Sequence, residues 1–584
     1  MSDVPGPGPD LLPVVVGVSG HRTLRPQDVA PLEASVSAIF AEMRAAWPTT
    51  PLCVLSPCAE GADRLVARVA LRHGARLLVL LPMPRALYEA DFSPASLAEF
   101  RSLADRPGVR CLEVPLLAGT TEEGVADPLG ADRKLQYLRM GTFLARHCAV
   151  LVALWNGKPG AEVGGTAQIV AFKRSGRLEL APALRGRMEA DEEPFRYRRT
   201  PLDAPETGVI HHVWTSAGDD DVPEGSVGER RLLRPDGLTS PVEVAAFDRR
   251  NVEIGARIES FNATLARAAL GGEPPPAPRP ELPEDLGRLH AFLERTDRAA
   301  SRLQARTWRT LTLLCWSAFL AAAAFGAFAH LAERTQARAI ALAAYLGFLA
   351  AAALLWVIAK GQRFQDRFQD LRAVAEGLRI QYFWRLAGLP HAAADHYLRK
   401  QRSDLDWIRH AVRYWGFATA PIQPARLDRV FDEWIEDQIR YYRARAAYHR
   451  RAAERLHACA RVSLVASLAL AALWGIAALA AIRAGRASAP ELTGHTFEAF
   501  VVVVPLLVVA SGIFHLVNEK RAHGPHARQY DRMLGFFLAA RAELADPGRD
   551  SGGTLLELGK EALAENGDWV LLHRERPLEI PHGA

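Results

Sequence analysis

The sequence has few cysteines, little net charge and no concentrated basic patch. Its six cysteines are scattered along 584 residues and lack the Cys and His spacing of a zinc site. We therefore expect reduced, packed thiols and no metal-binding residues. The net charge of +5 is small for this length, and the arginines lie beside apolar segments instead of among aromatic residues. Nucleic acid is therefore not an expected partner.

The first residues lack the pattern of a secretory signal peptide. No positive charge precedes the short apolar run in MSDVPGPGPDLLPVVVGVSGHR, and that run is typical of a β-strand. We expect residues 1–11 to be disordered. The chain is longer than one hydrophobic core usually organises, so at least two domains are expected.

The C-terminal half contains four apolar segments that are long enough to cross a membrane. Each has about 20 residues, enough for a helix to span a hydrocarbon layer of roughly 30 Å. None carries Asp, Glu, Lys or Arg in its interior. Burial in a large soluble core is the alternative, but soluble core helices are usually shorter. The predicted transmembrane helices are 310–331, 339–359, 462–482 and 499–517.

Basic residues beside these segments predict their orientation. Five arginines precede the first segment between residues 295 and 309, and six precede the third between 443 and 461. Each of the two hairpin loops holds only two arginines. By the positive-inside rule, the hairpin tips lie outside and both termini are cytoplasmic. We therefore expect a multi-pass protein of the inner (cytoplasmic) membrane.

Charged, helix-forming sequences flank each hairpin, and the order helix, span, tip, span, helix occurs twice. This repetition suggests a duplicated module. We assign residues 285–415 to the first module and 416–575 to the second, and treat 576–584 as a tail.

The first 215 residues alternate short apolar runs with amphipathic stretches. This pattern predicts a parallel sheet with helices on both faces. The expected fold is thus an α/β Rossmann-like domain at 12–215, followed by an all-α membrane domain. Residues 216–284 form a linker with an acidic loop near 217–240 and one helix at 243–269. Strands are predicted near VVVGVS, LCVLS, ARLLVLLP, VRCLEV, AVLVALW and VIHHVW, and helices at 28–46, 61–73, 131–146 and 165–175.

Glycines and polar residues gather where the predicted strands end. Sheets of this kind bind ligands outside the carboxyl ends of their strands, where backbone N–H groups and helix N-termini favour anions. Paired glycines before a helix let a phosphate approach the backbone closely. The candidate ligand-binding residues are Ser19, Gly20, His21, Arg22, Ser56, Glu60, Gly61, Asp63, Arg64, Pro82, Trp155, Asn156, Gly157, Gly164, Gly165, Thr166 and Gln168.

Each of these motifs also has a purely structural explanation. Two glycines before a helix often form only a tight turn. Arg22 could pair with Asp63 to stabilise the fold, and Glu60 could cap a helix. A functional role is favoured because several loops at one predicted sheet edge carry such residues.

Several motifs together resemble the SLOG superfamily, which groups the DNA-processing protein DprA with the LOG cytokinin-activating phosphoribohydrolases. The motifs are VGVSGHR, LSPCAEGADRLVA, LLVLLPMP with Tyr88 and Asp91-Phe92, VLVALWNG and GGTAQIVAF, within residues 12–215. The resemblance implies a nucleotide or nucleotide-derived ligand at this sheet edge and no other cofactor.

One position departs from the hydrolytic branch of that superfamily. Its motif resembles PGGxGTxxE, in which the last Glu helps to cleave an N-glycosidic bond, and this chain has Ile169 there. Isoleucine cannot stabilise a sugar carbon that becomes cationic. Binding without this hydrolysis is therefore favoured, and no catalytic residue is assigned. Glu60 and Asp63 are the candidates if the domain catalyses another reaction.

The membrane half resembles the SLATT family of two-helix membrane modules, which are associated with SLOG domains and nucleotide second messengers in bacterial conflict. The likeness lies in Trp434, Gln438, Tyr441 and Tyr442, in the LGKEAL motif at 558–563 and in Trp569. The resemblance implies a sensor-effector of bacterial stress or anti-phage defence that forms a homo-oligomeric pore. A membrane-tethered hydrolase of nucleotides or nucleosides is the alternative.

Overall fold

The computed structural model describes most of the chain and divides into two compact units. The predicted disordered N-terminus and tail fall outside the described residues, apart from residues 11 and 576. The first unit is Met1–Arg295, Gly377–Arg385 and Leu389–Pro421, and the second is Thr296–Glu376, Leu386–Gly388 and Ile422–Ala584. The described residues are 11–160, 162–191, 195–197, 206–218, 225–270, 276, 279–331, 335–398, 405–485, 495–546 and 548–576.

The first unit contains a seven-stranded sheet of order β4-β3-β2-β1-β5-β6-β7. All neighbouring strands are parallel except β6 and β7. β2 and β5 are buried throughout, which explains their uninterrupted apolar runs. The six predicted strands are present, and the α/β fold class is confirmed. The strands are β1 Val14–Gly20, β2 Leu52–Ser56, β3 Arg76–Leu81, β4 Arg110–Glu113, β5 Val150–Trp155, β6 Val209–Trp214 and β7 Arg230–Leu233.

β7 lies in the segment that the sequence predicts as an acidic loop, and that prediction is wrong for residues 230–233. The strand pairs antiparallel with β6, with Ile210 opposite Leu233 and Val213 opposite Arg230. Its first three residues are exposed, so the segment has little of the apolar pattern that predicts strands. The segment is extended because its backbone pairs with the edge of β6.

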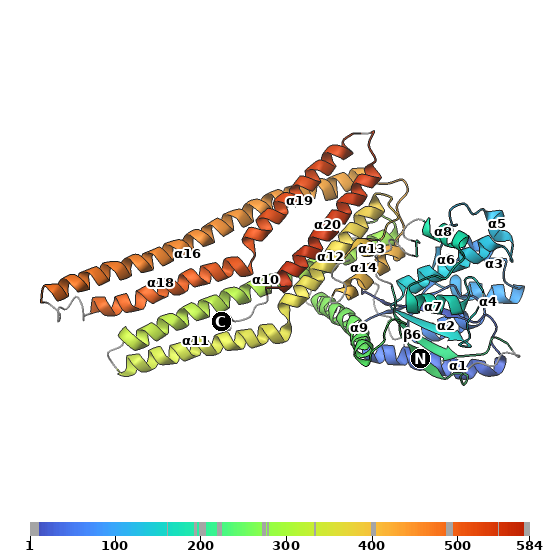
Figure 1. The fold of residues 1–584 in the computed structure, drawn as a ribbon, viewed down its shortest axis with the longest axis horizontal. Coiled ribbons are helices and arrows are strands. Elements are labelled where there is room, and N and C mark those ends of the chain that lie inside the picture. The colour runs from blue at the N-terminus through green and yellow to red at the C-terminus, as the bar shows by residue number, and fades with distance from the viewer. Residues whose placement is uncertain are drawn as a thin grey trace. The chain divides into compact units, whose positions relative to one another are not determined.

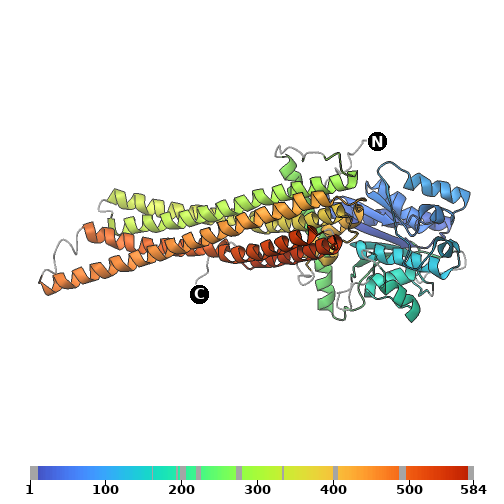
Figure 2. The ribbon, with the colours of Figure 1, turned by 90° about the horizontal axis from the view of Figure 1, so that it is seen from above.

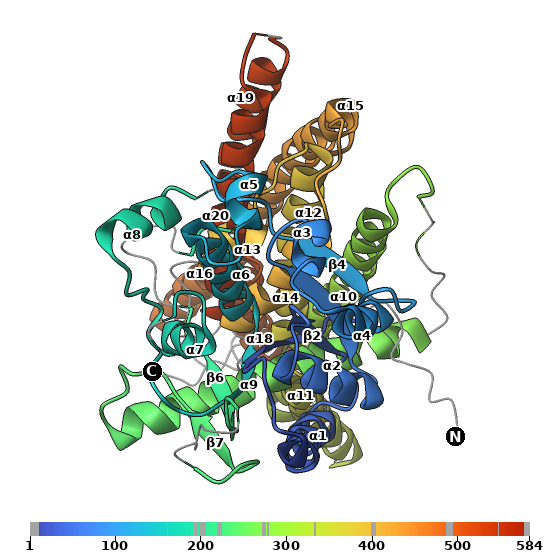
Figure 3. The same cartoon turned by 90° about the vertical axis from the view of Figure 1, so that its right-hand side faces the viewer.

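Helices cover both faces of this sheet. α1 packs beside α2 on one face, and α6 packs beside α7 on the other (Figures 1 and 3). All four lie where the sequence predicts helices. The helices between the strands are α1 Val29–Ala46, α2 Ala62–Arg72, α3 Arg85–Glu89, α4 Pro94–Ala104, α5 Glu122–Ala126, α6 Ala131–His147, α7 Thr166–Ser175 and α8 Pro182–Glu189, with a 3-10 turn η1 at Pro26–Asp28.

The helix predicted in the linker is α9, Pro241–Leu270, and it packs on the α/β domain. The amide of Asn262 donates to the backbone oxygen of Leu12 at 2.8 Å and to the Thr50 hydroxyl at 3.0 Å. The Glu259 carboxylate accepts from the Thr49 backbone N–H at 3.0 Å. Part of the predicted linker is thus an integral layer of the first unit.

Four helices are long and apolar enough to cross a membrane. They contain the predicted spans, and between 0 and 11% of the residues in the most apolar stretch of each are buried. Such exposed apolar helices indicate a multi-pass membrane protein, because only lipid or another chain would cover them. The orientation of the termini stays a prediction. The helices are α10 Glu284–Gly326, which continues into the π-turn η2 Ala327–Leu331, α11 Thr335–Gln362, α16 Asp437–Arg483 and α18 His495–Lys520.

Within the second unit, α16 and α18 run side by side (Figures 1 and 2). The hydroxyl of Ser467 donates to the backbone oxygen of Val504 at 3.1 Å, and Ser511 donates to that of Ala460 at 2.8 Å. Small hydroxyl residues of this kind join helices in lipid. The two hairpins also touch each other, since a Cβ on Gly326 would lie 3.0 Å from Val502.

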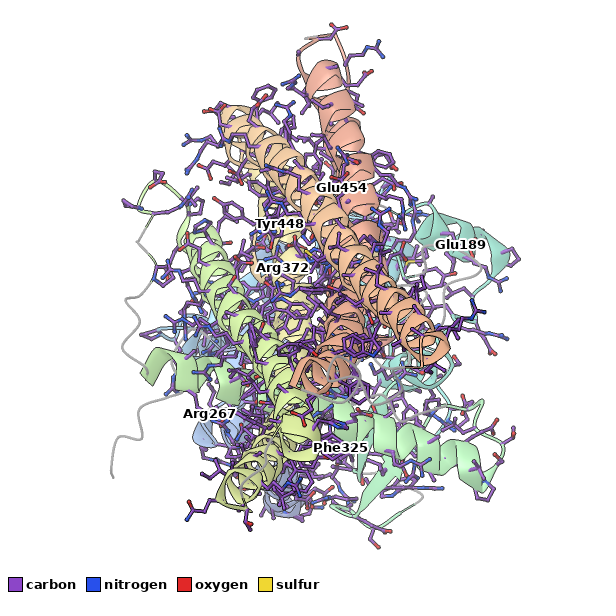
Figure 4. The ribbon with its side chains drawn as sticks, turned by 90° about the vertical axis from the view of Figure 1, so that its left-hand side faces the viewer. Glu189, Arg267, Phe325, Arg372, Tyr448 and Glu454 are labelled. Atoms are coloured by element: carbon purple, nitrogen blue, oxygen red, sulfur yellow. The ribbon has the colours of Figure 1, made fainter. Side chains whose placement is uncertain are left out.

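Charged helices continue from the spans, as predicted. Figure 4 shows Tyr448 and Glu454 on α16 and Arg372 on α12. Arg372 pairs with Asp297 at 2.6 Å and with Glu376 at 3.1 Å. The remaining helices are α12 Phe364–Leu386, α13 Ala393–His396, α14 Asp406–Ala418, α15 Leu427–Val430, the π-turn η3 Phe431–Glu436, α19 His523–Leu544 and α20 Ser551–Arg574.

Candidate functional site

A cavity of about 650 Å³ opens at the carboxyl ends of β1 and β5. These strands are neighbours, but the chain leaves β1 toward β2 and leaves β5 toward β6, in opposite directions along the sheet. α/β sheets bind ligands at such a switch point, where the connecting segments diverge and leave a crevice. The volume suits a small molecule.

The structure brings one group of the predicted ligand-binding residues together around this cavity and leaves the others outside it. The lining residues are Ser19, Gly20, His21, Arg22, Asp63, Trp155, Asn156, Gly164, Gly165 and Thr166. Those that do not line it are Ser56, Glu60, Gly61, Arg64, Pro82, Gly157 and Gln168. Of the two candidate catalytic carboxylates, Asp63 therefore lies at the cavity and Glu60 does not.

Some of the residues outside the cavity hold its loops in place. The hydroxyl of Ser56 accepts from the backbone N–H of Cys58 at 3.1 Å, and the Arg64 guanidinium donates to the Cys58 oxygen at 3.1 Å. The Gln168 side chain accepts from the backbone N–H of Gly164 at 2.8 Å. Arg64 also pairs with Glu99 at 2.8 Å. These bonds explain why polar residues stand at the strand ends without touching a ligand.

His21 joins the loop after β1 to the loop after β5. Its backbone N–H donates to the oxygen of Leu154 at 3.0 Å, and its Nε2 accepts from the backbone N–H of Asn156 at 3.0 Å. An accepting Nε2 carries no proton, so this contact needs the neutral ring. His21 therefore joins these two loops at the mouth of the cavity.

Two glycines let the end of β1 approach α2 and β5. A Cβ on Gly20 would lie 2.4 Å from the Cβ of Ala62, and a Cβ on Gly61 would lie 2.3 Å from the backbone oxygen of Arg22. Gly61 also has a φ of +72°, a backbone angle that residues with a Cβ rarely adopt. Both glycines hold Arg22 and Asp63 at adjoining parts of the cavity wall.

Replacing Gly61 with alanine is expected to destabilise the chain by roughly 1–3 kcal/mol through backbone strain and to displace Arg22. The matched control is Gly186→Ala in α8, where a Cβ would meet nothing within 4 Å. That change removes a helix-interior glycine and is expected to stabilise by roughly 0.5–1 kcal/mol. Thermal melting of the full chain in detergent measures both. Equal melting temperatures for the two variants would contradict this account of Gly61.

Cationic groups from α6 and from the loop after β1 border the cavity. The guanidinium of Arg22 lies over the ring of Tyr137, 5.1 Å from its centroid. Arg133 forms an ion pair with Asp91, and the Tyr137 hydroxyl donates to the same carboxylate at 2.5 Å. Lys134 lines the cavity on the same helix. An anion placed here would meet positive charge from two elements.

The N-terminus of α7 opens at the same cavity. Gly164 and Gly165 precede it, and Gly164 has a φ of +85° that brings its backbone against α6. The Ser19 hydroxyl donates to that of Thr166, the first residue of the helix, at 3.4 Å. N–H groups in a first helical turn carry partial positive charge, which favours a phosphate or carboxylate. Farther along α7, Ile169 packs on Gly141 of α6. Ile169 is the residue that stands where the similar hydrolytic motif PGGxGTxxE has its Glu.

Asp63 is the buried acid of the cavity. It is 4% exposed, and its Oδ1 has no hydrogen-bond partner among the described residues. No ion pair joins it to Arg22 there, so the purely structural pairing considered from the sequence does not form. Burial raises the pKa of its carboxyl to about 7, against the opposing effects of Arg22, the Ala59 backbone and Arg64. The group therefore exchanges a proton near neutral pH.

The cavity residues of α6 are among those that the sequence missed. Arg133 and Tyr137 are four residues apart on one helical face, beside Lys134. This spacing predicts that the two side chains share one face of the helix, so the sequence could have shown that they lie together. Nothing local shows, however, that the face meets the ends of β1 and β5, because the crossover between β4 and β5 decides that contact.

The far end of α6 enters a network of buried ion pairs. Arg146 pairs with Asp395 of α13 at 3.3 Å, and its backbone oxygen accepts from Arg413 of α14 at 3.0 Å. Glu206 pairs with Arg409 at 2.8 Å and with Arg413 at 2.9 Å. α13 and α14 follow the first membrane hairpin in the chain. α6 therefore links the cavity to segments that are continuous with the membrane helices.

Comparison of the chain with models of protein families, with characterised proteins and with solved structures finds no match. The arrangement of the cavity and of the ion-pair network is therefore the observation from which a function is argued.

Proposed function

We propose that the protein is a membrane-bound sensor-effector whose α/β domain binds a nucleotide or nucleotide-derived ligand and thereby controls the transmembrane helices. The observation that carries the proposal is the cavity at the switch point, where Arg22, Lys134 and the N-terminus of α7 surround one space. A phosphate would be stabilised by all three. The resemblance of the strand-end motifs to the SLOG superfamily supports the same ligand class.

Control of the membrane helices would act through α6. Tyr137 and Met140 line the cavity on this helix, and Arg146 ends it in the ion-pair network with α13 and α14. A ligand shifts a balance between two arrangements only by its difference in affinity for them. Movement of α6 on ligand binding would change the packing of α14, and so bias the chain segments that lead to the spans.

The effector is proposed to be a pore of several copies, in line with the resemblance to SLATT modules. Four helices in one chain rarely enclose a conduit, and few residues in their most apolar stretches are buried. A homo-oligomer in the inner membrane, with both termini in the cytoplasm, would cover part of that surface. Release of ions or metabolites in response to a nucleotide signal would suit a bacterial stress or anti-phage response.

Reconstitution of the full chain into dye-loaded liposomes tests this function. Among ATP, ADP, ADP-ribose and cyclic dinucleotides, at least one is expected to raise the melting temperature and release dye. Arg22→Glu should weaken its binding roughly 100-fold, because a cation beside the phosphate becomes an anion. Arg106→Glu makes the same charge change at an exposed position outside the cavity and should leave binding intact. Failure of every nucleotide to bind would refute the proposed ligand class, and binding without dye release would refute the pore.

Asp63 favours one alternative, a membrane-tethered hydrolase of nucleotides or nucleosides. A buried acid whose pKa lies near 7 is suited to proton transfer, and it lines the cavity. The spans would then serve as anchors. New products after incubation with the nucleotide panel, lost in Asp63→Asn, would support this activity, and unchanged nucleotides would exclude it for the panel.

A further inference from the structure

We propose that Asp63 determines the specificity of this cavity by accepting a hydrogen bond from a sugar hydroxyl, so that the ligand is a phosphorylated sugar or a nucleotide and not a simple phosphate. This inference rests on the proposed function and names the residue that would recognise the sugar of its ligand. It assigns separate tasks to the two kinds of charge at the cavity. The cations hold the phosphate, and the buried carboxylate recognises the sugar.

The unsatisfied acceptor is the first observation behind this assignment. Asp63 is almost fully buried and lines the cavity, yet its Oδ1 has no partner among the described residues. Leaving a buried acceptor unsatisfied costs roughly 1–3 kcal/mol. A ligand that brings a donor to this oxygen recovers that energy, whereas a ligand without a donor does not. A hydroxyl is the donor that a phosphorylated sugar carries.

A second residue that lines the cavity carries an unsatisfied group of the opposite kind. The indole Nε1 of Trp155, at the end of β5, is buried and has no partner among the described residues. Trp155 also lines the cavity. Two residues that line the cavity therefore each carry a buried polar atom without a partner among the described residues, an acceptor on Asp63 and a donor on Trp155. A hydroxylated molecule with one anionic group could engage the cations and both of these atoms, whereas a fully ionised phosphate has no hydrogen to donate to Asp63.

The surroundings of Asp63 favour its ionised form once a donor is bound. Asp63 is the second residue of α2, where the partial positive charge of a helix N-terminus stabilises a carboxylate. Arg22 and Arg64 act in the same direction. Burial raises the pKa of the Cys58 thiol to about 12 and that of the Tyr88 hydroxyl well above its usual value, so both stay neutral. The titratable and charged groups that face Asp63 are Arg22 from the loop after β1, Cys58 from the loop after β2, Arg64 from α2 and Tyr88 from α3.

Binding of a hydroxyl donor is therefore coupled to loss of a proton. In the free protein the carboxyl is partly protonated near neutral pH, and a donated hydrogen bond stabilises the carboxylate. Affinity for the sugar-bearing ligand should then rise as the pH increases from 6 to 8. Affinity for a simple phosphate monoester should not rise in this way through Asp63, because that compound brings no sugar hydroxyl.

Calorimetric titration of the full chain in detergent with ribose 5-phosphate and with methyl phosphate tests the inference. Ribose 5-phosphate is expected to bind at least tenfold more tightly than methyl phosphate at pH 7.5. Asp63→Asn should reduce that ratio to below about threefold, while methyl phosphate binds the variant at least as tightly because a negative charge has been removed. The matched control is Asp105→Asn, at an exposed aspartate outside the cavity.

The ratio of the two affinities in the unmodified protein gives a second, variant-free measurement. It should increase from pH 6 to pH 8, and heats measured in buffers of different ionisation enthalpy should show more proton release on binding of ribose 5-phosphate than on binding of methyl phosphate, since both ligands share the ionisation of the phosphate. Equal affinities for the two compounds, or a ratio that does not change with pH, would overturn the role of Asp63 while phosphate binding still supports the proposed function. Absence of binding by both compounds would overturn the proposed phosphate site itself and the inference with it.

Discussion

Replacing Glu206 with glutamine is expected to lower the free energy of unfolding of the first unit by about 3–5 kcal/mol, because it leaves buried arginines without their shared carboxylate. Glu206 contacts both Arg409 and Arg413 within 3.0 Å, and these guanidiniums are 4% and 2% exposed. Arg409 keeps an ion pair with Asp406 at 3.3 Å, so Arg413 is the buried cation that loses its carboxylate among the described residues and keeps the cost of leaving water. The loss should appear as a lower melting temperature of the full chain in detergent.

The control for this prediction is Glu42→Gln. Glu42 pairs with Arg230 at 2.8 Å but is 59% exposed, so its loss should cost less than about 1 kcal/mol. The double variant Glu206→Met with Arg413→Met should recover part of the stability lost in Glu206→Gln, since both charges are then absent. Similar melting temperatures for Glu206→Gln and Glu42→Gln would show that the network contributes little.

The effect should be complete at neutral pH. Burial alone would raise the pKa of Glu206, but Arg413, Arg409 and Arg146 outweigh it and hold that pKa well below its usual value. A carboxylate of this kind contributes its stability above the pKa of the unfolded state and loses it only as the pH falls through the lower folded value. If the network also couples α6 to the membrane segments, Glu206→Gln should uncouple nucleotide binding from dye release.

Acidification is expected to destabilise the second unit steeply below pH 6.5, through four histidines beside the second hairpin. The Nδ1 atoms of His449 and His523 lie 2.9 Å apart, and the Nε2 atoms of His526 and His573 lie 3.2 Å apart. Burial lowers the pKa of His449, His523 and His573 to about 4 and that of His526 to about 2. The rings are packed against one another and against Tyr530 and Trp569.

The sign of this effect follows from which state holds more protons. The unfolded histidines titrate near pH 6.5, so the unfolded chain binds protons first as the pH falls, and stability is lost from there down toward the folded pKa values. His573 alone would account for roughly 3 kcal/mol over that range. The charged groups facing the cluster are Arg445, Arg521 and Arg576, which lower these pKa values further.

Melting temperatures of the full chain between pH 7.5 and pH 5 measure this prediction. A decrease of at least about 10 °C is expected. His526→Phe keeps a stacked ring against His573 and Tyr530 but removes the histidine with the lowest pKa, so it should make the decrease smaller. The control is His457→Phe, an exposed histidine of α16 outside the cluster. An equal pH dependence in His526→Phe and the unmodified protein would contradict the role of the cluster.

The sheet shows how far local patterns predict this fold. β2 and β5 are recognisable in the sequence because central parallel strands are buried on both faces and therefore consist of unbroken apolar runs. β7 is not, because an edge strand with exposed Arg230 and Arg231 owes its conformation to β6. The spans are predicted most sharply, since lipid demands an uninterrupted apolar stretch of fixed minimum length.

The candidate site shows a similar division. Strand-end residues such as Ser19 and Trp155 could be proposed from the sequence, because parallel strands present their carboxyl ends at one edge. Tyr137 could not, since it reaches the cavity only through the crossover that carries α6 over the sheet. The burial of Asp63 and the unsatisfied state of its Oδ1 were also invisible, because Arg22 and Asp63 follow two predicted strands that end at one sheet edge and so suggested an ion pair that the structure does not form.

The amino-acid sequence by itself determined the α/β class of the first part of this protein and the presence of four apolar helices, because both follow from the local period and length of hydrophobic runs. Only the tertiary structure decided that β1 and β5 are neighbours, that α6 borders both the cavity and the network of Arg146, Glu206 and Arg413, and that Asp63 is buried with its Oδ1 unsatisfied among the described residues. These features join residues far apart in the chain, and their energies depend on burial and on neighbouring charges that no local pattern specifies.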